Sequence, residues 1–176
     1  MTPQKKNSFF TQNSLFGLFV GLSFIAVAYA YYKGGRGVSL NPQLNNVILL
    51  LSIAGSFIGV RKYRDELSAT HFSYGQALGA CIYLLSVASV VYGIFVYFLY
   101  RHHPELLENY LLSVETTFRE VYAGSALADN MISMLKAFTT PTTIAMAEIF
   151  NKILSGILFS FFVAGLLRKN KKHELI

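Results

Sequence analysis

Residues 76–100 read QALGACIYLLSVASVVYGIFVYFLY, a run without one charged side chain. A helix rises about 1.5 Å per residue, so about 20 apolar residues are needed to cross a hydrocarbon core about 30 Å thick. The run is long enough to span a bilayer. Because its apolar character is continuous, it differs from the alternating pattern of a membrane β-barrel strand.

Three further stretches are also strongly apolar and long enough to span a bilayer, at about residues 15–32, 44–60 and 143–167. The composition agrees, because 53% of the residues are hydrophobic and only 14% are charged, against about 25% charged residues in soluble domains. We therefore predict an all-α fold, an integral membrane four-helix bundle that forms a single domain over residues 1–176. The one cysteine, Cys81, lies inside the third span, which excludes an intramolecular disulfide.

The segment of about 104–138, between the third and fourth spans, has a different pattern. Apolar residues recur there at helical spacing with glutamates between them, which predicts an amphipathic helical segment with a break at 123–125. We expect its first helix, at about 104–122, to lie along the outer membrane surface or to cap the bundle. Five side chains should turn inward: Leu107, Leu111, Val114, Phe118 and Val121.

Two helix starts are marked by capping residues. Asn41 followed by Pro42 is typical of an N-cap and first helical position. Ser73 and Gln76 have the spacing of a capping box, and Phe72 precedes them at the position of a hydrophobic staple.

The net charge of +6 comes from basic residues that flank the spans, so it does not indicate a nucleic-acid partner. If all four spans are real, nine basic residues lie on the side of both termini and five on the other. The nine are Lys5, Lys6, Arg61, Lys62, Arg64, Arg168, Lys169, Lys171 and Lys172. This asymmetry predicts that both termini are cytoplasmic and that the amphipathic segment faces outward.

Ionisable side chains inside a membrane are costly and often functional. Glu148, Asn151 and Lys152 form the one such cluster in the spans, and Glu148 and Lys152 can pair at i,i+4. A proton or ion site is one interpretation. We favour another, because Glu148 lies about 30 Å from Arg168 along a helix, which places it near the outer interface. Lys152 would then extend its charge outward to water.

A second polar cluster follows the second span and contains Arg61, Lys62, Arg64, Asp65 and His71. It is a candidate cytoplasmic rim for a lipid or a partner. The favoured interpretation is a charged stop at the membrane surface with internal ion pairs. We predict no metal site, no catalytic residues and no cofactor, because no nucleophile–base pair or ligand spacing is recognisable.

Small residues at four-residue spacing occur in three of the spans, where they allow helix backbones to approach closely. The pairs are Gly17 and Gly21, Gly55 and Gly59, and Gly156 and Ser160. The spacing leaves open whether the partner helix belongs to the same chain or to a second copy.

The residues Lys62-Tyr63-Arg64-Asp65 after the second span and Phe72-Ser73-Tyr74-Gly75-Gln76-Ala77 before the third resemble the DUF4199 family. These are small bacterial membrane proteins, found chiefly in the Bacteroidota. The resemblance implies the four-span layout and a location in the bacterial cytoplasmic (inner) membrane. The family has no established activity, so it supplies no site residues.

Three function hypotheses remain. The leading one is a non-enzymatic scaffold or accessory subunit that is embedded in the lipid bilayer. It would bind a lipid or another membrane protein through its outer segment and its cytoplasmic rim. The second is a small channel or transporter that forms as a homo-oligomer. The third is a membrane enzyme that acts on a lipid phosphate through Arg61, Arg64, Asp65 and His71.

Overall fold

The computed structural model describes residues 9–39, 41–67, 72–122 and 126–168, and these form six helices. The helices are α1 (Phe9–Lys33), α2 (Pro42–Glu66), α3 (Tyr74–His102), α4 (Pro104–Val121), α5 (Ala126–Phe138) and α6 (Pro141–Leu167). Four of them, α1, α2, α3 and α6, are long and apolar enough to cross a membrane. The predicted four-helix membrane bundle is confirmed.

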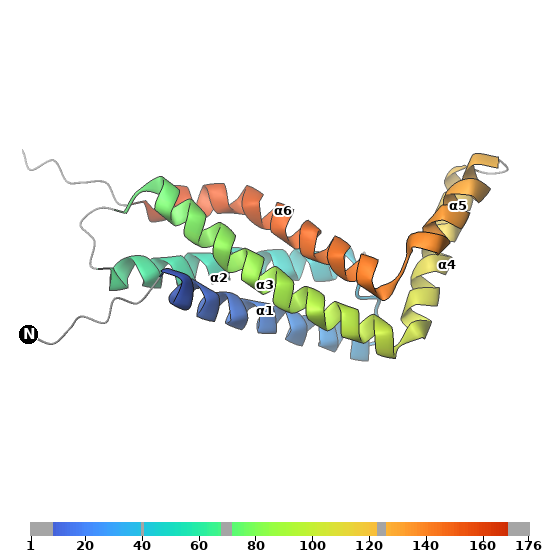
Figure 1. The fold of residues 1–176 in the computed structure, drawn as a ribbon, viewed down its shortest axis with the longest axis horizontal. Helices are drawn as coiled ribbons and strands as arrows, with labels where there is room; N and C mark the ends of the chain where they lie inside the picture. Colours follow the sequence, from blue (N-terminus) through green and yellow to red (C-terminus); the bar gives the residue numbers. More distant parts are fainter. Residues whose placement is uncertain (1–8, 40, 68–71, 123–125, 169–176) are drawn as a thin grey trace, which may run out of the picture.

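The four long helices lie side by side, and α3 packs against α1, α2 and α6 (Figure 1). The helices α4 and α5 pack against each other and stand at a steep angle to the bundle, beyond one of its ends (Figure 1). We call α4 and α5 the hairpin, and this end the hairpin end. The first residue of α1 and the last residue of α6 lie at the opposite end (Figure 1).

The predicted helix starts are confirmed. The Asn41 side chain accepts hydrogen bonds from the backbone N–H groups of Gln43 and Leu44, at 3.0 and 3.1 Å. The Ser73 hydroxyl accepts from the N–H of Gln76 at 3.2 Å, and the Gln76 side chain accepts from the N–H of Ser73 at 2.9 Å. These contacts satisfy backbone donors that the first turn of a helix leaves without partners.

Two helices are longer than their apolar runs. The first begins at Phe9, not near residue 15, because Asn13 is fully buried and donates to the Phe9 carbonyl at 2.8 Å. The second continues past Val60 to Glu66. It can do so because Tyr63 is buried while the charged side chains Arg61 and Asp65 lie on the exposed face.

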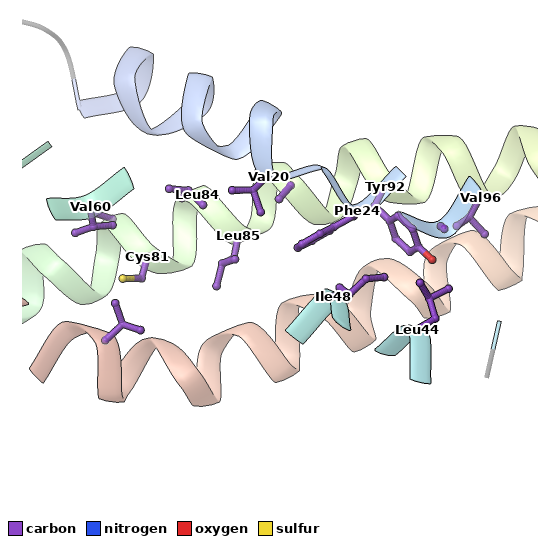
Figure 2. Packing of buried hydrophobic residues seen from close by; sticks show 14 of the residues in the cluster. Val20, Phe24, Leu44, Ile48, Val60, Cys81, Leu84, Leu85, Tyr92 and Val96 are labelled. Atoms are coloured by element: carbon purple, nitrogen blue, oxygen red, sulfur yellow. The ribbon is translucent and has the colours of Figure 1, made fainter. Parts of the chain in front are cut away.

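The core follows α3 through the bundle. Buried side chains of α1 and α2 meet it along most of its length, as Figure 2 shows for Val20, Phe24, Leu44 and Ile48. The rings of Phe24 and Tyr92 meet edge to face, with centroids 6.1 Å apart. Cys81 is fully buried in the same cluster.

The outward faces of the long helices are apolar, unlike the surface of a soluble protein. Large apolar side chains are exposed on all four of them. Examples are Leu15, Phe19, Leu50, Ile58, Ile94, Phe98, Phe150, Leu158 and Phe162. This surface suits contact with lipid.

The predicted small residues lie where helices meet within the chain. A Cβ atom on Gly17 would come 2.7 Å from the Leu84 carbonyl oxygen, and one on Gly21 would come 2.9 Å from that of Ala88. Both glycines therefore bring α1 close to the backbone of α3. The other positions face neighbouring helices too: Gly55 faces Val20, Gly59 faces Phe16 and Leu84, Gly156 faces Leu85, and Ser160 is fully buried.

We predict that Gly17→Ala separates α1 from α3 and destabilises the protein by about 1–3 kcal/mol, the usual cost of overpacking. The matched control is Gly165→Ala, where an added Cβ meets no atom within 4 Å. Because Cys81 is the only cysteine and is fully buried, a thiol-reactive dye reports unfolding in detergent during a thermal ramp. Equal melting temperatures for the two variants would contradict the predicted approach of α1 to α3.

Candidate functional site

Glu148 and Lys152 form an ion pair inside the bundle. The Lys152 Nζ lies 3.0 Å from Glu148 Oε2, and each residue is only 7% exposed. They stand seven and eleven residues after Pro141, about 10 and 16 Å along α6. The pairing that their spacing predicted is confirmed.

The side chain of Lys152 does not extend to water, so that part of the prediction is wrong. Its Nζ donates to Asn45 Oδ1 of α2 at 2.6 Å and lies 5.6 Å from the centre of the Tyr92 ring of α3. Three helices therefore supply groups that compensate its charge. Asn151 is exposed, and its backbone carbonyl accepts from the Ser155 hydroxyl at 2.8 Å.

Sequence reasoning missed Asn45 and Tyr92. Asn45 lies in the first turn of α2 after its cap, and Tyr92 is one aromatic residue in an apolar run, so neither has a distinctive local pattern. Their role becomes visible only once the fold shows that α2 and α3 bring them next to Lys152. Within the described part of the chain, the buried Tyr92 hydroxyl makes no hydrogen bond, and the contact of Glu148 Oε2 is its ion pair with Lys152.

A polar cavity of about 940 Å³ lies at the hairpin end, between the α1–α2 loop, α3 and α4. Its walls carry three tyrosines, two opposite charges and three amides: Tyr32, Tyr100, Tyr110, Arg36, Glu105, Asn41, Gln43 and Asn109. Burial first, and then the charge of Glu148, raise the pKa of the Tyr110 hydroxyl. The buried ion pair therefore lies within electrostatic reach of this cavity, although neither of its residues lines it.

The charged groups of this cavity keep unused hydrogen-bonding capacity. Arg36 donates to Gln43 Oε1 at 3.4 Å and lies 5.5 Å from the centre of the Tyr31 ring, yet a guanidinium has five donors. Glu105 Oε1 lies 2.9 Å from His103 Nδ1. A hydrogen bond to its own backbone N–H and the one to His103 lower the pKa of Glu105, so it is a carboxylate near neutral pH.

An apolar groove of about 420 Å³ lies on the other side of Tyr110, between the hairpin and the start of α6. Phe118 of α4, Met134 and Phe138 of α5, and Ala147 of α6 line it. Met134 and Phe138 are 60% and 68% exposed. The groove therefore presents apolar surface that the described residues leave open.

The hairpin is held together by ion pairs. Glu115 contacts Lys136 at 2.7 Å and Arg119 at 3.0 Å, and Arg119 also contacts Asp129 at 3.3 Å. Hydrogen bonds from Lys136 and Arg119 lower the pKa of the Glu115 carboxyl. Two of these ion pairs, Glu115 with Lys136 and Arg119 with Asp129, therefore connect the antiparallel helices α4 and α5.

The predicted inward stripe of α4 is only partly realised. Leu107, Leu111, Val114 and Phe118 are half-buried, whereas Val121 is 66% exposed, so its predicted burial is wrong. The reason is the angle at which α4 leaves the bundle. Among its residues, the packing against the bundle core comes from the first two turns, through Leu106, Leu107 and Tyr110.

The charged residues at the opposite end contact each other. Arg64 pairs with Asp65 at 2.8 Å and donates to the Leu167 carbonyl at 3.3 Å, while Arg61 lies 3.9 Å from Asp65. Lys62 lies over the Phe16 ring, 5.5 Å from its centre. The predicted internal ion pairs are therefore present, and His71 lies outside the described residues.

In the part of the chain that the structure describes, no three His, Cys, Asp or Glu side chains converge as metal ligands would. The family model described as "Protein of unknown function (DUF4199)" matches residues 14–169, which includes α1 from Ser14 onward and all of α2 to α6. The chain belongs to the DUF4199 family. No curated protein and no solved structure matches it.

For this DUF4199 protein we predict that Glu148→Gln destabilises the bundle by about 3–5 kcal/mol, because it leaves the Lys152 charge buried without a carboxylate. The double variant Glu148→Gln/Lys152→Met should recover most of that loss. The control is Arg61→Gln, which breaks an exposed pair and should cost less than about 1 kcal/mol. The thermal dye assay on Cys81 measures all three, and a double variant no more stable than Glu148→Gln would contradict the prediction.

Proposed function

We propose that this protein is a non-enzymatic component of the bacterial cytoplasmic membrane that binds a lipid or a partner protein at its hairpin end. One observation supports this most strongly. The hairpin stands away from the bundle (Figure 1). Two cavities, one polar and one apolar, lie beside α4 and share Tyr110. A site that is polar on one side and apolar on the other, at the end of a membrane bundle, suits the binding of a lipid or a membrane protein.

The two other hypotheses have less support. For a lipid-phosphate enzyme, Arg61, Arg64 and Asp65 would have to act on substrate, but they are engaged with one another and with the end of α6. For a channel or transporter, the ion pair Glu148–Lys152 would have to face a water path, but it lines neither of the two cavities at the hairpin end.

The proposal includes an orientation, with the hairpin end outside and both termini in the cytoplasm. The basic residues support it, since nine of them belong to the side of the termini and five to the other. In a Cys81→Ser background we expect Ser113→Cys, on exposed α4, to react with a membrane-impermeant maleimide in intact cells. Arg168→Cys should react only after the membrane is opened, and the reverse pattern would contradict the orientation.

We predict that Phe138→Glu abolishes binding at the hairpin end, because it places a charge in an apolar groove. The matched control is Leu112→Glu, since Leu112 is equally exposed, at 63%, but does not line the groove. Polymer-encased membrane discs purified without detergent are analysed by mass spectrometry for co-purifying proteins and lipids.

The wild-type protein and Leu112→Glu should retain the same specifically co-purifying protein or lipid, and Phe138→Glu should lose it. If the same proteins and lipids co-purify in the same amounts with the wild type and both variants, the hairpin end is not the binding site and the proposed function is wrong.

A further inference from the structure

The polar cavity at the hairpin end has opposite charges on its walls. Arg36, in the loop after α1, supplies a cation, and Glu105, in the first turn of α4, supplies a carboxylate. Each keeps hydrogen-bonding capacity for a ligand, because the contacts of Arg36 with Gln43 and of Glu105 with His103 use only part of it. A ligand that matches this cavity carries both a negative and a positive group.

A purely anionic ligand fits less well. The start of α2 lines the cavity and could have offered backbone N–H groups to an anion. However, the Asn41 side chain already accepts from the N–H groups of Gln43 and Leu44. The remaining attraction for an anion is Arg36, and the carboxylate of Glu105 opposes it.

The tyrosines favour a cationic group on the ligand. Tyr32, Tyr100 and Tyr110 line the cavity, and an ammonium over an aromatic face is attracted by the ring. This preference is already seen at the same end of the bundle, where Lys33 lies over both Tyr29 and Tyr32 and Arg101 lies over Tyr97. Because Tyr32 already carries a cation and Tyr100 is only 4% exposed, the half-buried Tyr110 is the cavity ring offered to the ligand. Tyrosines and basic residues at this level are typical of the headgroup region of a membrane.

The apolar groove adjoins the polar cavity, because Tyr110 lines both. A molecule that fills the two sites has a polar, doubly charged part joined to a hydrocarbon part. We propose that the hairpin end binds a phospholipid with a zwitterionic headgroup. Its phosphate contacts Arg36, its ammonium contacts Glu105 and the Tyr110 ring, and one acyl chain occupies the groove lined by Phe118 and Phe138.

This inference rests on the proposed function, which it narrows to one class of lipid. It is tested on the full chain in detergent by native mass spectrometry. Three lipids with identical acyl chains are added separately: phosphatidylethanolamine, phosphatidylcholine and phosphatidylglycerol. We expect the two zwitterionic lipids to be retained about tenfold better than phosphatidylglycerol, the size of effect expected for one charged contact.

Two variants test the two charges. Arg36→Gln should reduce retention of phosphatidylethanolamine about tenfold, and Glu105→Gln should remove the preference over phosphatidylglycerol. The matched controls are Arg101→Gln and Glu108→Gln, which change exposed residues near the same end that do not line the cavity, and they should behave as the wild type. A 100-fold excess of glycerophosphoethanolamine, which lacks acyl chains, should not displace the lipid.

Each other outcome overturns the inference in a distinct way. Equal retention of all three lipids, unchanged by Arg36→Gln and Glu105→Gln, means nonspecific lipid contact. Stronger retention of phosphatidylglycerol means an anion site, and displacement by glycerophosphoethanolamine means a soluble ligand. In these cases the proposed function still stands if Phe138→Glu abolishes native binding, whereas it falls with the inference if that variant has no effect.

Discussion

Close approach of helix backbones is the constraint on which this structure depends. In lipid the burial of apolar side chains contributes little to helix association, because the surrounding hydrocarbon is as apolar as the core. Helix association must therefore come from van der Waals contact between closely packed helices. Gly17 and Gly21 allow this contact, because they bring α1 against the carbonyl groups of α3. With α1, α2 and α6 packed on α3, Tyr97 and Tyr100 of α3 lie at the hairpin end, where α3 leads directly into α4.

The buried ion pair adds a polar constraint to this packing. An isolated charge inside the bundle would be costly, so Lys152 needs Glu148, Asn45 and Tyr92 together. These groups come from α6, α2 and α3, so the pair ties three helices at one level. It lies about three turns from the start of α6, and therefore close to the point where α5 joins the bundle. The pair thus helps to fix the base of the hairpin and the cavities beside it.

The sequence was sufficient for features that depend on local pattern. Continuous apolar runs predicted four spans, capping residues predicted the starts of α2 and α3, and i,i+4 spacing predicted the pair of Glu148 with Lys152. It failed where distant residues meet. Asn45 and Tyr92 compensate Lys152 from other helices, and the polar cavity joins Arg36 to Glu105 across 69 positions of the chain. Hydropathy also misled at Asn13, which precedes the apolar run that predicted the first span but is buried in α1.

The central claim is that these small-residue contacts form within one chain and not between two copies. In a Cys81→Ser background, Gly21→Cys is combined with Val91→Cys, since a Cβ on Gly21 would lie 2.9 Å from that of Val91. Oxidation in native membranes should give a monomer whose mobility changes on a non-reducing gel. The control, Leu22→Cys with Val91→Cys, starts from a residue that is 48% exposed and should not cross-link. A disulfide-linked dimer from the Gly21→Cys/Val91→Cys variant, with no internal cross-link, would contradict the account.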